Sequence, residues 1–94
     1  VLLPKKVNWL FQDVAQAGQV DIFTSACRRF LAPGGMGLLS LKAASERWTG
    51  EGEAALFEEV EQRLKNAGFH VDESIELAGY EDHHRLFVIH SPEA

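Results

Sequence analysis

An alternation of two hydrophobic periods along the chain is the feature that most restricts its fold. Short apolar runs, of the kind that form buried strands, occur at Val7–Phe11, Gly37–Leu41 and Leu86–Ile89. Apolar residues recur at the spacing of one helical face from Val20 to Leu31, and again within Glu53–Asn66. Strands that alternate with helices in this way predict an α/β domain in which neighbouring strands run parallel.

The segments between the apolar runs predict where the elements end. Pro33-Gly34-Gly35 should end the first helix after Leu31 and lead into the second strand. From Phe69 to Leu77 the apolar spacing is close to period two, with an irregularity near Asp72-Glu73-Ser74. The polar stretch Ala78–His83 then turns the chain, so the last strand is predicted to be antiparallel. The predicted order is β-α-β-α-β-β.

Length and cysteine content set further limits. The 94 residues allow one domain, residues 1–94. No apolar run reaches the roughly 18 residues that a membrane span needs, so no contact with a membrane is expected. The single cysteine, Cys27, excludes an internal disulfide and a cysteine-based zinc site. It also predicts a reducing environment, the cytoplasm.

The charge of the chain is unevenly distributed. A net charge of −5 disfavours binding of nucleic acid through bulk charge. The segment from Glu46 to Asp82 holds eleven acidic and three basic residues, a balance of −8, which leaves +3 for the rest of the chain. Any contact with RNA is therefore expected outside this acidic segment.

Three polar groups are predicted to meet at one edge of the sheet. Ligands of open α/β sheets bind beyond the carboxyl ends of the parallel strands. Asp13 follows the first predicted strand, and Lys42 follows the second at the same end. Because the last strand runs in the opposite direction, His83 and His84 at its start belong to that edge too. An acid, an amine and an imidazole that converge from distant parts of the sequence point to a catalytic site.

Each of these residues also has a structural interpretation. Asp13 could cap the turn before the first helix, Lys42 could be a solvated residue at the end of a strand, and the histidines could lie in a surface turn. A different class of enzyme would need a nucleophile. The two possible nucleophiles are more typical of packing residues, because Ser40 lies within a predicted strand and Cys27 on a buried helix face.

Five strings of the sequence recur, in this order and spacing, in a known family. They are Asp13-Val14-Ala15-Gln16, Phe30 to Gly37, Ser40 to Ser45, Gly68-Phe69 and Tyr80 to His84. Together they resemble the second half of the fibrillarin-like RNA 2′-O-methyltransferases. The resemblance implies the C-terminal half of a Rossmann-like sheet that binds S-adenosylmethionine, with the N-terminal cofactor-binding half absent.

The resemblance also implies roles for individual residues. Members of the family use a Lys-Asp-Lys-His set to activate the ribose 2′-hydroxyl of a guided RNA. Asp13 matches the Asp of this set, Lys42 its second Lys and His84 its His, whereas its first Lys has no counterpart here. His83 stands where the family usually has Asp, so a shift of one residue would make His83 the match. Asp13 and Gln16 are implied as cofactor contacts, and Lys42 could be either the base or an electrostatic clamp.

Two functions from different classes follow. The first is an S-adenosylmethionine-dependent 2′-O-methyltransferase of rRNA or tRNA, in a box C/D guide-RNA complex with a scaffold protein. It would act only when an N-terminal half completes the cofactor pocket. The second is a non-catalytic half-domain that dimerises or serves as an interaction module. The strand Val7–Phe11 supports dimerisation, because an apolar sheet edge without Pro or inward charge can pair with a second copy.

Overall fold

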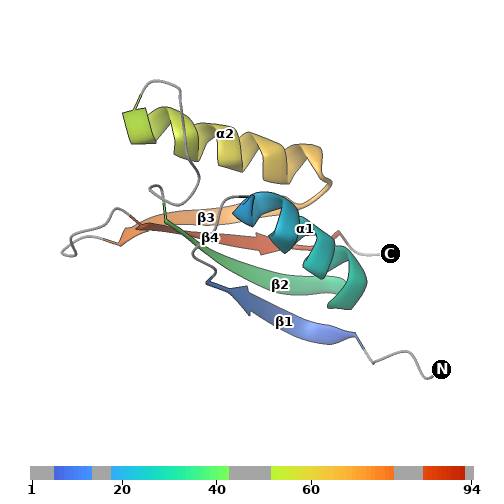
Figure 1. The fold of residues 1–94 in the computed structure, drawn as a ribbon. Helices are drawn as coiled ribbons and strands as arrows, with labels where there is room; N and C mark the ends of the chain where they lie inside the picture. Colours follow the sequence, from blue (N-terminus) through green and yellow to red (C-terminus); the bar gives the residue numbers. More distant parts are fainter. Residues whose placement is uncertain (1–5, 14–17, 43–51, 78–83, 93–94) are drawn as a thin grey trace.

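Six elements follow one another in the predicted order (Figure 1). The structure, a computed structural model, describes residues 6–13, 18–42, 52–77 and 84–92. The elements are β1 (Val7–Gln12), α1 (Gln19–Phe30), β2 (Leu31–Lys42), α2 (Gly52–Asn66), β3 (His70–Leu77) and β4 (His84–His90). Neither of the helices described here has the length and hydrophobicity needed to cross a membrane.

The four strands form one mixed sheet in the order β1-β2-β4-β3. β1 and β2 run parallel, whereas β4 lies between β2 and β3 and is antiparallel to both. The predicted antiparallel hairpin at the end of the chain is therefore confirmed. The irregularity predicted near Asp72 is also present, as a register shift between Val71 and Glu73 where β3 pairs with β4.

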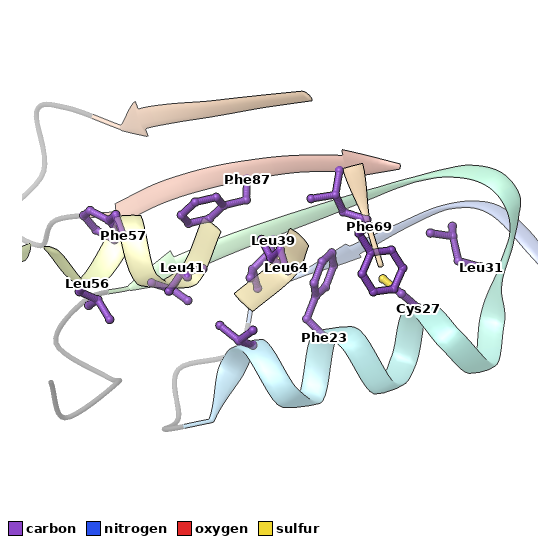
Figure 2. Packing of buried hydrophobic residues seen from close by; sticks show 13 residues of the cluster. Phe23, Cys27, Leu31, Leu39, Leu41, Leu56, Phe57, Leu64, Phe69 and Phe87 are labelled. Atoms are coloured by element: carbon purple, nitrogen blue, oxygen red, sulfur yellow. The ribbon is translucent and has the colours of Figure 1, made fainter. Parts of the chain in front are cut away.

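Both helices lie on the same face of the sheet (Figure 1). In α1, Val20, Phe23 and Cys27 follow one another at helical spacing and are all buried. Arg28 and Arg29 lie in the last turn of α1, where positive charge interacts favourably with the helix dipole. The helices and the sheet share one core (Figure 2), formed by Val20, Phe23, Cys27, Leu31, Leu39, Leu41, Leu56, Phe57, Val60, Leu64, Phe69, Phe87 and Ile89.

Gly37 allows α1 to approach the sheet closely. A Cβ atom at this position would lie 2.7 Å from Ile89 Cδ1 and 2.8 Å from Phe23 Cζ. Both distances are shorter than ordinary van der Waals contacts, so any larger residue requires its neighbours to shift. The lack of a side chain at Gly37 is thus what lets Phe23 pack onto β2.

The second strand begins earlier than the sequence pattern predicts. Leu31, assigned to the helical face by its spacing, is instead the first residue of β2 and pairs with Val7. Its backbone is extended, with φ −86° and ψ 128°, and α1 ends one residue before it. Leu31 is still buried, because the start of β2 lies under the same core. The spacing identified a core residue correctly but assigned it to the wrong element.

The pairing of β1 with β2 is interrupted near its start. Val7 lies opposite Leu31, but Trp9 lies opposite Met36, so several residues of β2 loop out between these pairs. Gly34, in the looped-out stretch, has a φ of 74°, a conformation that favours glycine. Pro33-Gly34-Gly35 therefore forms a bulge within β2 as well as following the helix.

The sheet face opposite the helices, which we call the open face, is uncovered in the described part of the chain (Figure 1). Trp9 is 63% exposed and Phe11 52% exposed, and both point away from the core. They lie in register with Met36 and Leu38 of β2, so their side chains form one apolar surface. Ile75 of β3 is also exposed. A surface of this kind is typical of a sheet that packs against a further layer.

Candidate functional site

The predicted site residues leave neighbouring strands at one edge of the sheet. Asp13 directly follows β1 and is exposed, and Lys42 is the half-buried last residue of β2. His84 is the first residue of β4, and its main chain lies in register with that of Lys42. The backbone geometry thus brings together three chain positions that are distant in sequence. Gln16 and His83 lie outside the described residues.

Two buried glutamines join the ends of β1 and β2. Gln12, the last residue of β1, donates a hydrogen bond from Nε2 to the main-chain oxygen of Gln19 at 2.9 Å. Gln19 Nε2 donates to the main-chain oxygen of Lys42 at 3.3 Å, and the Lys42 N–H donates to Gln19 Oε1 at 3.4 Å. The sequence pattern did not single out either glutamine. A signal was available in the sequence, because Gln12 occupies an inward position of a strand and Gln19 begins an apolar helix face. Polar residues at buried positions need hydrogen-bond partners.

Lys42 belongs to the open face of β2. Leu39 and Leu41 are buried in the core, and successive strand residues point to opposite faces of a sheet. Lys42 therefore leaves β2 on the side opposite α1 and α2, next to the end of the sheet where Asp13 leaves β1. A substrate that reaches both residues would lie beyond the carboxyl ends of the strands, where α/β sheets bind ligands.

The two potential nucleophiles are packing residues, as predicted. Cys27 is 1% exposed in the core between α1 and the sheet, and burial raises the pKa of its thiol to about 11. A thiol with a raised pKa is a poor nucleophile at neutral pH. Ser40 is buried within β2. Both residues therefore serve the packing of the described structure.

Arg85 adds a second cation near this edge, but on the helix-covered side. Its Nη1 donates to Ser74 Oγ at 3.0 Å, and its guanidinium carbon lies 5.0 Å from the centre of the Phe57 ring. These contacts hold the first turns of α2 against β3 and β4. Arg85 Nε is buried and has no hydrogen-bond partner in the described part of the structure.

A histidine cluster lies at the opposite end of β3 and β4. The His70 and His90 rings stack with centroids 4.5 Å apart, and His90 Nδ1 lies 2.7 Å from Asp72 Oδ1. No set of three or more His, Cys, Asp or Glu side chains with metal-binding geometry occurs among residues 6–13, 18–42, 52–77 and 84–92. The cluster is remote from the strand ends that carry Lys42 and Asp13.

Comparisons with known proteins place the chain beside one family. The family model described as Fibrillarin matches residues 1–92. A fibrillarin-like rRNA/tRNA 2′-O-methyltransferase from Thermococcus gammatolerans is 41% identical over 90 residues, which are 96% of this chain and 39% of that protein. The Methanococcus jannaschii fibrillarin pre-rRNA processing protein superposes with a TM-score of 0.87 at 29% identity, over 96% of this chain and 39% of that one.

Two further similar structures are complexes, one with a small molecule and one with a second protein. Aeropyrum pernix fibrillarin in complex with natively bound S-adenosyl-L-methionine matches with a TM-score of 0.72 and 26% identity, over 93% of this chain and 37% of that one. A fibrillarin/Nop5p complex matches with a TM-score of 0.78 and 26% identity, over 94% of this chain and 41% of that one. The chain thus spans about two fifths of the length of the relatives it matches.

Proposed function

Because the chain belongs to the fibrillarin family, we propose that it forms the catalytic C-terminal part of an S-adenosylmethionine-dependent RNA 2′-O-methyltransferase. Its substrate would be rRNA or tRNA paired with a box C/D guide RNA. The observation that carries this proposal is the backbone convergence of Asp13, Lys42 and His84 at the carboxyl ends of β1 and β2. The resemblance matches these residues to the family's catalytic set, with His83 as the alternative to His84.

The chemistry requires a charged site at this edge. A ribose 2′-hydroxyl is a weak nucleophile, so a nearby base or cation must favour its alkoxide character. Lys42 would interact with that oxygen, as base or as positive charge, and Asp13 would hold the ammonium group and contact the cofactor. His84, whose main chain lies beside that of Lys42, would complete the proton pathway. S-adenosylmethionine supplies an electrophilic methyl group when it is bound.

The residues at the edge fit such a cofactor. Asp13 is an exposed carboxylate at the end of a parallel strand, a position that suits a ligand with positive charge. Gln16, three residues further on, would add an amide. The chain spans about two fifths of its relatives, so we assign the rest of the cofactor pocket to the remaining portion of such a protein. On its own the chain is expected to transfer no methyl group.

Charge favours a protein partner for the acidic segment. The segment from Glu46 to Asp82 has a balance of −8, and Glu58 and Glu59 of α2 are exposed. Such a surface attracts a basic partner at long range. A ribonucleoprotein scaffold protein would fit, as in the solved fibrillarin/Nop5p complex. The single buried Cys27 suits a reducing compartment, so we assign the complex to the cytoplasm.

The test is to complete the pocket and follow both cofactor binding and methyl transfer. The chain would be mixed with the N-terminal half of the Thermococcus gammatolerans relative, and S-adenosylmethionine binding measured by calorimetry. Methyl transfer to a guided RNA should then appear, and Lys42→Met should lower kcat by about 10²-fold or more. Lys65→Met, at the far end of α2, is the matched control and should leave kcat unchanged. A completed assembly that binds no cofactor, or in which Lys42→Met stays fully active, would contradict the proposal.

The exposed edge strand β1 favours a second candidate function, a non-catalytic dimerising module. In the described part of the chain β1 pairs with β2 alone, and Trp9 and Phe11 on it are largely exposed. Two copies could pair through the edge Val7–Phe11. Light scattering, together with Trp9 fluorescence in a Trp48→Phe background, would detect concentration-dependent association. A stable dimer that persists after the N-terminal half is added, without methyl transfer, would favour this function over the enzyme.

A further inference from the structure

We propose that Gln19 is a positioning residue of the site, which fixes the place of Lys42 through its main chain. This inference rests on the proposed function of Lys42. Gln19 is the first residue of α1 and is fully buried, with 0% of its surface exposed. Its carboxamide binds both main-chain polar groups of Lys42: it donates to the carbonyl oxygen at 3.3 Å and accepts from the N–H at 3.4 Å.

The position of this contact along the sheet gives it a specific role. The register of β1 with β2 ends at the pair of Gln12 and Leu39, so β1 does not extend alongside Lys42. Beyond that pair, the Gln19 amide binds the side of β2 that β1 no longer covers. The Gln19 side chain thus makes the hydrogen bonds to Lys42 that a neighbouring strand would otherwise make. Without it, the main chain that carries the Lys42 ammonium would lose two of its hydrogen bonds at this end.

Gln12 extends the same connection to the other strand. It is 7% exposed, ends β1, and donates to the main-chain oxygen of Gln19 at 2.9 Å. A continuous path of hydrogen bonds therefore runs from the end of β1, through the start of α1, to the end of β2. Asp13 directly follows Gln12, so the path joins the two strand ends that carry the predicted acid and amine. These two buried amides therefore help to set the separation of the two strand ends.

The chemistry of the Gln19 side chain suits this task. A buried donor or acceptor without a partner is costly, so the position demands a side chain that both donates and accepts. An amide does so at every pH, without charge. Leucine has a similar size and offers neither group. A glutamate donates only when it is protonated, so Gln19→Glu should restore the pairing as the pH falls.

The first test is amide hydrogen exchange in the chain itself, measured by NMR. In Gln19→Leu, the exchange of the Lys42 amide should accelerate by about tenfold relative to that of Leu39 in the same molecule. The matched control is Thr24→Val, because Thr24 is also buried in α1 but donates to Asp21 O within the helix at 3.2 Å. This control should leave the ratio unchanged. An unchanged ratio in Gln19→Leu would overturn the proposal.

The second test uses the chain completed by the N-terminal half. Gln19→Leu should lower kcat by about 10²-fold, the size expected for a small misplacement of a reacting group, with little change in KM for S-adenosylmethionine. Gln19→Glu should recover kcat, relative to the parent at the same pH, as the pH is lowered, and an unchanged KM separates this effect from a general loss of structure. Full activity of Gln19→Leu would overturn the positioning role. A parent assembly without any transfer would instead overturn the proposed function, and the exchange ratio would still decide whether Gln19 fixes Lys42.

Discussion

The two faces of the sheet are built from the same kinds of residues, yet within the described residues only one of them is covered. Phe87 of β4 is fully buried beneath the helices, whereas Phe11 of β1 is 52% exposed on the open face. Both lie in strands with alternating inward and outward residues. The difference arises from the helices, since α1 and α2 both pack on one side (Figure 1). An apolar strand pattern therefore identifies surfaces that are suited to burial but does not identify what buries them.

Exposure across the open face is itself graded. Val88 in the central strand β4 is only 9% exposed, whereas Trp9 on the edge strand β1 is 63% exposed. Parallel strands of α/β proteins are normally covered on both faces. β1 and β2 are therefore the strands whose open face lacks the most coverage. The relatives that this chain matches are more than twice its length, which leaves ample chain for a second layer. We therefore expect the missing contacts to lie over Trp9 and Phe11.

The largest expected effect separates the two faces directly. Phe87→Ala should lower the free energy of unfolding by about 3–5 kcal/mol, because it leaves a cavity in the shared core. Phe11→Ala removes the same side chain from the open face and should cost less than about 1 kcal/mol in the isolated chain. Urea denaturation followed by circular dichroism measures both values.

Completion of the protein should sharpen this contrast. If a second layer covers the open face, Phe11→Ala should become as costly as a core substitution once the N-terminal half is bound. Equal losses for the two variants in the isolated chain would show that the open face is already buried, for example in a dimer. Light scattering on the same samples distinguishes that case.

A smaller effect is expected where α1 meets the sheet. Gly37→Ala places a Cβ atom against Ile89 Cδ1 and Phe23 Cζ, and overpacking of this kind costs about 1–3 kcal/mol. Ile89→Val removes the nearest of these atoms, so the double variant should recover part of the loss that Gly37→Ala causes. Denaturation of the single and double variants measures this coupling. Strictly additive losses would contradict the close contact.

The sequence predicts much of the covered face and little of what organises the site. Helical spacing placed Phe23 and Cys27 in the core, and the change of period after Gly68 predicted the final hairpin. The start of β2 at Leu31 was missed, because a core position at a helix end has the same spacing as the helix itself. Whether such a residue ends the helix or begins the strand is decided by its backbone conformation, which is extended at Leu31.

The site shows the same division. The strand order places Asp13, Lys42 and His84 at one edge, as their positions in the sequence predict. The hydrogen bonds of Gln12 and Gln19 could not be predicted, because they join residues through tertiary geometry and leave no periodic signal. The open face was foreseen only as a sheet edge, since a strand pattern does not say on which side a helix will pack.

The smallest expected effect concerns the pH dependence of the covered face. Burial raises the pKa of the Cys27 thiol from 9.0 to about 11, so the folded state keeps this proton where the unfolded state loses it. The resulting stability is fully present below pH 9 and declines as the pH rises toward 11, by roughly 1–2 kcal/mol. Urea denaturation at pH 8 and pH 10.5 measures the decline, and Cys27→Ala should reduce it, because groups other than this thiol titrate alike in both proteins. An identical decline in parent and variant would mean that water reaches Cys27 beneath α1, and the contrast between the covered and open faces would then be weaker than the static structure indicates.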